Sequence, residues 1–300
     1  MKRFVKKYLF KFAPQLAFAL TSLRRRRRDH RQNLAARKIA RAEIFKNAEP
    51  VVVTGPFAGM RYIDEYTFVP IALIWSGIYE AQLNPWVRMI IDGPYDSFID
   101  IGAAEGYYAV GIARARPDLN VVTFEADPFS RRAQRRLAGL NGVTNIDVRS
   151  LCDHRTLEDV LGKRPVILCD IEGGEVDLID PIRVPGLRRA DLIVETHLYD
   201  DLTIPQVTEL LAERFRGTHR IEVVHANSEE AEKAPLLEKM RRRGIPAAIV
   251  NEIASIKPPT PNEWLILTAQ QNNDMPRLVP EMIAAEKPET SRVAIRSPSS

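Results

Sequence analysis

The stretch FIDIGAAEGYYAVGIA, residues 98–113, carries the signals that decide the fold. An apolar run ends in an acid, Gly102 and Gly106 bracket a short turn, and a helical pattern begins directly after the second glycine. A strand, a glycine turn and a helix in this order open the folds that bind nicotinamide dinucleotides, flavins or S-adenosylmethionine. The details of the turn, and of the chain that follows it, therefore have to distinguish these ligands.

Strand and helix patterns alternate along the chain after this turn. We expect strands at 97–102, 120–125, 145–150, 165–170 and 191–196. We expect helices at 106–116, 128–140, 156–161, 175–179 and 205–215. Two further runs, 219–226 and 263–269, flank a charged helical insert at 229–243 and predict a late strand pair that completes the sheet as a hairpin. The predicted fold class is α/β, a Rossmann-like, mostly parallel seven-stranded sheet with helices on both faces and an N-terminal helical and hairpin extension.

Residues 1–47 form a strongly basic arm. They hold fifteen Lys and Arg against two acids, a net charge of +13, and since the whole chain carries +4 the other 253 residues carry −9. Apolar residues at roughly helical spacing precede the arginine run 24–28. The arm is therefore expected to be a segment on an anionic membrane surface, a segment that binds nucleic acid, or a solvated basic helix or disordered tail. The apolar stretch is shorter than the ~20 residues of a membrane span. The basic cluster stands where a signal peptide would be cleaved, so we expect a cytoplasmic protein, peripheral to the membrane through this arm.

The rest of the chain divides into a cap, a main domain and a tail. Residues 48–96 predict a hairpin at 51–63 followed by a helix at 70–92 that is interrupted near Pro85. The main domain is expected at 97–272, and the tail at 273–300, rich in Pro, Ser and charge, is expected to be disordered. The two cysteines have no paired spacing, which indicates neither a disulfide framework nor a zinc cluster and favours a reducing compartment.

The glycine turn favours S-adenosylmethionine over a dinucleotide. A dinucleotide site requires Gly-x-Gly-x-x-Gly, in which the middle glycine lets the backbone approach the pyrophosphate, and here Ala104 replaces it. Glu105 stands at the helix entrance, where a carboxylate repels a diphosphate but suits a ligand with a sulfonium and an ammonium. Glu125, nineteen residues after Gly106, ends the next strand and can accept hydrogen bonds from both ribose hydroxyls. Asp127 is better explained as the cap of the following helix.

Four segments in this order, DIGAAEGYYAVGIA, TFEADP, CDIEGGEVDLID and IVETH, resemble the FkbM-like class I methyltransferases. The similarity covers about residues 98–196 and continues weakly through RFRGTH at 214–219. It implies a Rossmann-like sheet that binds S-adenosylmethionine and an enzyme that methylates hydroxyl groups of sugars and secondary metabolites. It also implies that Asp100, Gly102 and Gly106 surround the methionine moiety, that Glu125 binds the ribose and that Asp153 contacts the adenine amino group. Leu168 departs from the family, which usually has a lysine there.

A second group of polar residues ends the fourth and fifth strands. Asp170, Glu172, Glu195 and His197 meet near the transferred methyl group if strands one, four and five are adjacent. Methyl transfer requires a base that removes the acceptor proton, for which His197 is the first candidate and Asp170 the second. In a purely structural role, Asp170 or Glu172 would only stabilise a tight turn at the two following glycines. The four residues could also hold magnesium, but their spacing does not require it, and we expect no metal.

The combined interpretation is an S-adenosylmethionine-dependent methyltransferase that acts on a hydroxyl of a small molecule or glycan. The cap helix at 70–92 and the insert at 229–243 are expected to shape the acceptor pocket. Nucleic-acid methylation is disfavoured because DGPY, at 92–95, stands before the glycine turn and because the body carries −9. A non-catalytic membrane or partner adaptor on the same fold is a second hypothesis. An NAD-dependent oxidoreductase is a third, which Ala104 and Glu105 disfavour.

Overall fold

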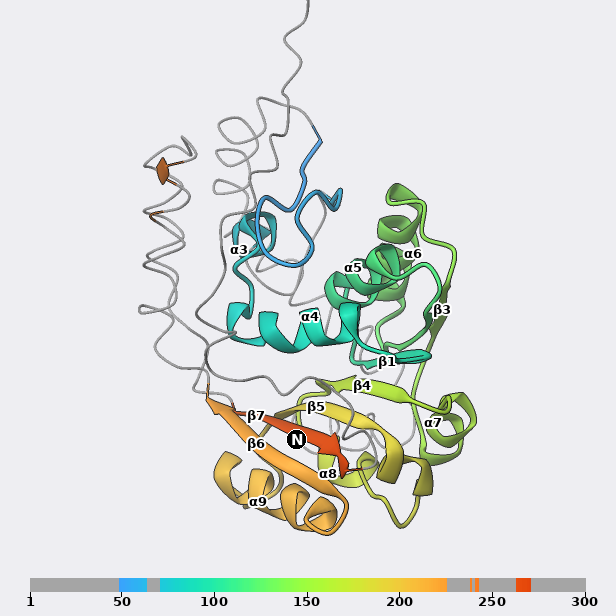
Figure 1. Cartoon of the computed structure of the whole chain (residues 1–300), viewed down its shortest axis with the longest axis vertical. Coiled ribbons are helices and arrows are strands. Elements are labelled where there is room, and N and C mark those ends of the chain that lie inside the picture. Colours follow the sequence, from blue (N-terminus) through green and yellow to red (C-terminus); the bar gives the residue numbers. More distant parts are fainter. Residues whose placement is uncertain (1–48, 64–70, 226–237, 239–240, 243–262, 271–300) are drawn as a thin grey trace, which may run out of the picture.

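The computed structural model of the protein describes residues 49–63, 71–225, 238, 241–242 and 263–270 (Figure 1). The basic arm, the tail and all but three residues of the predicted insert lie outside this part. At its centre is one seven-stranded sheet in the order β3-β2-β1-β4-β5-β7-β6. Its strands are β1 Ser97–Ile101, β2 Asn120–Phe124, β3 Ile146–Arg149, β4 Pro165–Cys169, β5 Asp191–Thr196, β6 His219–His225 and β7 Glu263–Ala269.

The first five strands run parallel, and β7 is antiparallel to both β5 and β6. The predicted fold class and the late strand pair are therefore confirmed, and β1, β4 and β5 are adjacent as expected. The register sets Ile101 beside both Phe124 and Cys169. Because parallel strands in this register end at the same level, the residues that follow them, Gly102, Glu125 and Asp170, emerge together at one edge of the sheet.

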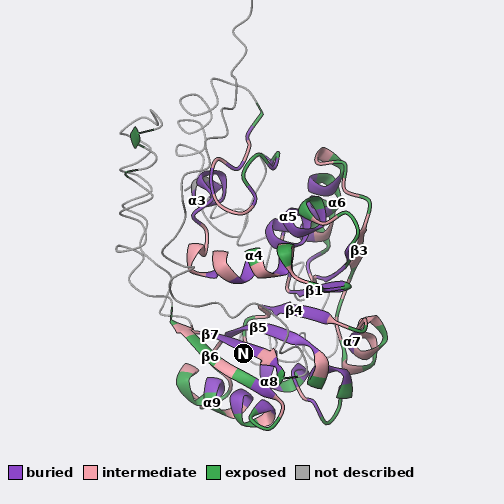
Figure 2. Cartoon of the chain, in the orientation of Figure 1, coloured by how far each residue is buried: buried purple, intermediate pink, exposed green. Residues whose placement is uncertain are grey.

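Helices cover both faces of the sheet. They are α4 Asn84–Asp92, α5 Tyr107–Ala115 and α6 Pro128–Leu140 on one side, and α7 His154–Val160, α8 Glu175–Leu178, η2 Pro185–Arg189 and α9 Ile204–Phe215 on the other. Successive strand residues alternate between two apolar clusters, so Phe98 packs with the first group of helices and Ile99 with the second. Figure 2 shows the central strands coloured as buried, which explains their continuous apolar sequence.

The segment before the sheet differs in detail from its prediction. Residues 51–63 form a single antiparallel bridge, Val51 to Arg61, instead of two strands, because Gly55 and Gly59 at positive φ fold the residues between into turns. The helical region is broken between α3 Ile71–Ser76 and η1 Ala81–Leu83, not near Pro85. Pro85 stands in the first turn of α4. Backbone N–H groups in a first turn have no partner within the helix, so the N–H that proline lacks is not needed there.

None of the helices in the described ranges combines the length and the apolar character that a bilayer-spanning segment needs.

Candidate functional site

A cavity opens to solvent at the carboxyl ends of β1 and β4, with about 440 Å³ of non-protein space that includes part of the open solvent. Its walls come from the glycine turn, from the segment before the sheet, and from β4, α5 and β7. The residues that line it are Tyr79, Glu80, Asp100, Gly102, Ala103, Ala104, Glu105, Tyr107, Tyr108, Leu168, Asp170 and Trp264.

The glycine turn is held against β4 so closely that its first position accepts no side chain. Gly102 has φ +91°, and a Cβ there would lie 1.7 Å from the backbone oxygen of Asp170. Gly106 has φ +93° and directly precedes α5, although it does not line the cavity. Ala104 stands at φ 45°, and the Gln134 side chain donates a hydrogen bond to its carbonyl at 2.8 Å. The turn is therefore a rigid wall whose shape depends on contacts with β4 and α6.

Asp100 places an unsatisfied carboxylate oxygen in the cavity wall. The residue is 1% exposed, and its Oδ2 is buried without a hydrogen-bond partner. Burial raises the pKa of Asp100 well above its ordinary value, and the nearby charges of Asp170 and Glu125 raise it further. A hydrogen bond from the Ala109 N–H to the carboxyl opposes this increase. A buried carboxylate oxygen without a partner, as Oδ2 is, is unfavourable, and a cationic ligand would stabilise it.

Glu125 lies behind the glycine turn and does not line the cavity. Its Oε2 accepts a hydrogen bond from the Ala104 N–H at 2.9 Å, and its Oε1 accepts one from the Asp127 N–H at 2.7 Å. Burial raises its pKa to about 7, against the opposing effect of these two hydrogen bonds. Each oxygen keeps a lone pair for a further donor, and the ribose contact stays a prediction. Asp127 caps α6 as expected, by accepting a hydrogen bond from the Phe129 N–H at 3.1 Å.

Asp153 caps the N-terminus of helix α7. Its Oδ1 accepts a hydrogen bond from the Thr156 N–H at 2.8 Å and forms the capping box of α7. Hydrogen bonds from the Thr156 backbone and side chain lower its pKa. It is not among the cavity-lining residues, and its contact with adenine stays a prediction.

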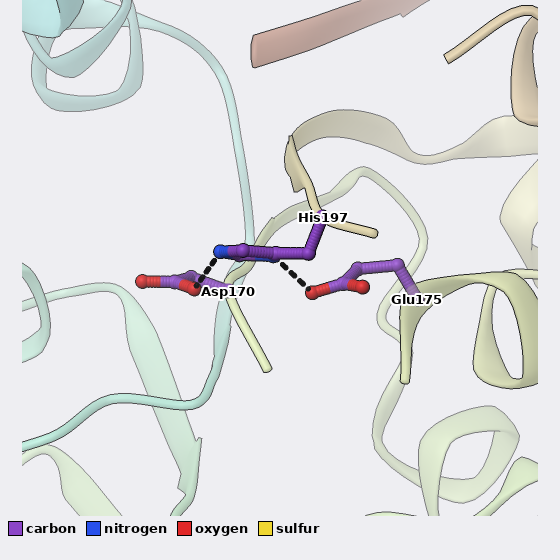
Figure 3. A group of neighbouring side chains, drawn as sticks. All are labelled: Asp170, Glu175 and His197. Carbon is purple, nitrogen blue, oxygen red and sulfur yellow. Dashed lines mark hydrogen bonds and ion pairs between the residues drawn. The ribbon is translucent and has the colours of Figure 1, made fainter. Parts of the chain in front are cut away.

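His197 follows β5 and lies between two acids, Asp170 and Glu175 (Figure 3). Its Nδ1 is 2.9 Å from Oε1 of Glu175, and its Nε2 is 3.6 Å from Oδ1 of Asp170. Oxygens of Glu172 and Glu195 each lie 3.9 Å from the same Nε2. The structure therefore brings the four residues predicted at these strand ends around one ring nitrogen.

Glu175 is a site residue that sequence reasoning missed. It belongs to the Asp-x-Glu-Gly-x-Glu pattern, but no role was expected for this second Glu. Its side chain is fully buried, and it accepts hydrogen bonds from the backbone N–H groups of Ile171 and Gly173 at 3.0 Å each. The tight turn after β4 is thus stabilised by Glu175, and not by Asp170 or Glu172 as a purely structural role for those two would require. Glu172 itself takes a left-handed conformation at φ 59°.

Burial and neighbouring charges shift the pKa values of both predicted catalytic groups, His197 and Asp170. Burial lowers the pKa of His197, but the hydrogen bond and the charge of Glu175, followed by the charges of Asp170 and Glu172, raise it overall. Burial raises the pKa of Asp170 to about 6, although the charge of His197 opposes this. The pKa of Asp170, about 6, lies in the range where a general base is effective.

No single sequence motif predicts the aromatic residues that line the cavity. Tyr79 and Glu80 come from the cap region, Tyr107 and Tyr108 begin α5, and Trp264 belongs to β7. The Tyr108 hydroxyl donates a hydrogen bond to Glu80 at 2.6 Å, and the Tyr79 and Tyr107 ring centroids are 5.6 Å apart. The expectation that the cap shapes the pocket agrees with the positions of Tyr79 and Glu80. The pair of tyrosines directly after the turn was the one available signal.

No family model and no curated protein matches the chain. Solved structures with a similar fold include a precorrin-6y C5,15-methyltransferase from Geobacter metallireducens, with a TM-score of 0.39 and 15% identity over 50% of this chain and 78% of that one. A human methyltransferase 10 domain containing protein has a TM-score of 0.44 and 13% identity over 79% and 97% of the two chains. A tRNA methyltransferase from B. subtilis has a TM-score of 0.37 and 11% identity over 63% and 67%. At these scores we infer neither activity nor substrate from the likeness, and the FkbM-like resemblance stays a prediction.

Proposed function

We propose that the chain is an S-adenosylmethionine-dependent methyltransferase of the FkbM-like type, which transfers a methyl group to a hydroxyl of a small molecule or glycan. The observation that carries this proposal is the buried, unpartnered Oδ2 of Asp100 in a cavity walled by the glycine turn. A buried carboxyl oxygen at that position favours a cation, which stabilises its ionised form, and disfavours a phosphate.

The other residues that line the cavity also favour a cation over a phosphate. Glu80, Glu105 and Asp170 also line the cavity, beside four aromatic side chains. Carboxylates and aromatic ring faces both attract cations such as a sulfonium or an ammonium. Asp100 is the partner that we assign to the ammonium of the methionine moiety, and Glu125 is the group that we assign to the ribose.

S-adenosylmethionine supplies, when bound, a methyl group that an acceptor oxygen displaces from sulfur. The chain's own residues have to align that oxygen and take its proton as the carbon–oxygen bond forms. His197 and Asp170 lie at the ends of β5 and β4, and Asp170 lines the cavity itself. The acceptor proton therefore passes to Nε2 of His197 or to the Asp170 carboxylate. We assign the basic arm to a membrane surface at the cytoplasmic side.

The test is ligand-induced stabilisation with three ligands in separate samples: S-adenosylhomocysteine, S-adenosylmethionine and NAD. A ligand at ~100 times its dissociation constant adds about 2.7 kcal/mol to the free energy of unfolding. We expect the two adenosyl-sulfur ligands to stabilise the wild type. In Asp100→Asn their affinity should fall about 10- to 100-fold, because a charged hydrogen bond contributes about 1.5–3 kcal/mol.

Asp201→Asn is the matched control, since Asp201 is an exposed acid that does not line the cavity. Its affinity for S-adenosylhomocysteine should equal that of the wild type. Stabilisation by NAD alone would identify a redox protein and overturn the proposal. An absence of stabilisation by all three ligands would overturn it in favour of a non-catalytic adaptor.

A further inference from the structure

We propose that Nε2 of His197, together with carboxylate oxygens of Asp170, Glu172 and Glu195, binds a divalent transition-metal ion. The three acids approach this nitrogen at 3.6, 3.9 and 3.9 Å. These separations are too long for hydrogen bonds. Ligands about 2.1–2.2 Å from one ion, at angles of about 90–125°, lie about 3.0–3.9 Å from each other. Each of the three acids therefore lies from Nε2 at a distance that separates two ligands of one ion, and Asp170 and His197 also belong, with Glu175, to a group whose ligand atoms lie within 4.8 Å of one another.

Glu175 orients the imidazole for this role. Oε1 of Glu175 lies within hydrogen-bond distance of Nδ1 of His197, at 2.9 Å. The same oxygen accepts hydrogen bonds from the Ile171 and Gly173 N–H groups, which fix its position. With the proton on Nδ1, the lone pair of Nε2 points at Asp170 (Figure 3). A histidine that donates one N–H to a buried carboxylate and binds a metal through the other nitrogen is a common arrangement in metalloproteins.

Unsatisfied oxygens beside the cluster point independently to a missing cation. The Asp170 carboxyl forms a hydrogen bond with the Glu195 side chain, but its Oδ1 is buried and has no hydrogen-bond partner. Asp100, which is 1% exposed and has an unpartnered Oδ2, lines the same cavity as Asp170. Within the described part of the chain, the ion pairs of Asp170 and Glu172 both end on His197. One imidazolium leaves this group strongly negative, whereas a divalent ion offsets two charges.

The ligand set indicates the class of ion. One imidazole nitrogen with three carboxylate oxygens suits Mn²⁺, Fe²⁺ or Zn²⁺ better than Mg²⁺ or Ca²⁺, which prefer oxygen alone. If the proposed function holds, the ion would lower the pKa of an acceptor hydroxyl in the adjoining cavity. In that state Nε2 of His197 is a ligand and no longer the base. Ion binding itself does not depend on the proposed function.

The test is titration of the full chain, freed of metal with a chelator and free of S-adenosylmethionine, with Mn²⁺ monitored by electron paramagnetic resonance. We expect one Mn²⁺ per chain at pH 7.5, and weaker binding at lower pH because protons compete for Nε2. His197→Gln and Glu195→Gln should each weaken binding at least 10-fold. Glu172→Gln should do so without affecting folding, since the Glu172 side chain is 75% exposed. Asp201→Asn is the control and should bind as the wild type does.

Two results would overturn the assignment: no stoichiometric Mn²⁺ binding by the wild type at millimolar concentration, or equal binding by the wild type and Glu172→Gln. Because cofactor is omitted, failure here leaves the methyltransferase proposal to its own test. Conversely, Mn²⁺ binding without any response to adenosyl-sulfur ligands would support the metal site alone.

Discussion

Gly102→Ala tests whether the glycine turn is rigidly packed against β4. Gly102 has φ +91°, and an added Cβ would lie 1.7 Å from the Asp170 carbonyl oxygen, half the 3.4 Å at which ordinary contact begins. The left-handed backbone costs an alanine about 1–2 kcal/mol. Separating the turn from β4 adds about 1–3 kcal/mol, because the obstacle is backbone and not a flexible side chain. We therefore expect a loss of about 2–5 kcal/mol in the free energy of unfolding.

Gly142→Ala is the matched control. Gly142 also has positive φ, +64°, but a Cβ there meets no atom within 4 Å. Its alanine variant should lose only the backbone contribution of about 1–2 kcal/mol. The difference of about 1–3 kcal/mol between the two variants isolates the clash, and corresponds to about 2–12 °C in Tm for a domain of this size.

The assay is urea unfolding followed by tryptophan fluorescence, with S-adenosylhomocysteine affinity measured on the same samples. Gly102→Ala should also weaken that affinity, because the clash displaces the cavity wall, whereas Gly142→Ala should not. Equal destabilisation of the two variants would refute the packing argument. Unchanged ligand affinity in Gly102→Ala would refute the assignment of the turn to the cofactor site.

Three further predictions follow from hydrogen bonds and pKa shifts. Asp127→Ala should lower the free energy of unfolding by about 1 kcal/mol and Asp127→Asn by much less, since the amide oxygen still caps α6; equal losses in urea melts would exclude the cap. The folded-state pKa of Glu125, about 7, exceeds its ordinary 4.5, so its stabilising contribution is complete below about pH 4.5 and is lost as pH rises through 7. Relative to Glu125→Gln, the wild type should therefore lose on the order of 3 kcal/mol between pH 4.5 and 8, and a pH-independent difference would contradict this. Glu175→Gln should lower the pKa of His197, followed by NMR of the imidazole, and an unchanged titration would disprove the contact.

The order and type of the described main-domain elements were predictable from the sequence because their signals are local. Alternating apolar runs and glycine or proline breaks depend on residues a few positions apart. The predicted strand 191–196 and helix 128–140 match β5 and α6 at both ends, and the Asp127 cap is confirmed. Pro85 was misjudged because the same residue either breaks a helix or begins one, and only the break at Gly77–Glu80 decides between them.

The site was only partly predictable. Strand ends in a parallel sheet face one edge, so the approach of Asp170 and Glu195 to His197 followed from the expected strand order. The hydrogen bond between His197 Nδ1 and Oε1 of Glu175 joins residues 22 positions apart through the turn after β4, and no spacing rule indicates it. The cavity wall made by Glu80 and Trp264 likewise depends on how distant segments pack.

The sequence by itself determined the succession of strands and helices, the glycine turn and the acids at the strand ends, because each is set by the backbone preferences and burial pattern of neighbouring residues. Only the tertiary structure decided which acid holds the imidazole, which carboxylate oxygens stay without a hydrogen bond, and which aromatic side chains close the cavity. Those features arise from contacts between segments far apart in the chain. Their geometry is settled by the packing of the whole core and not by any local preference.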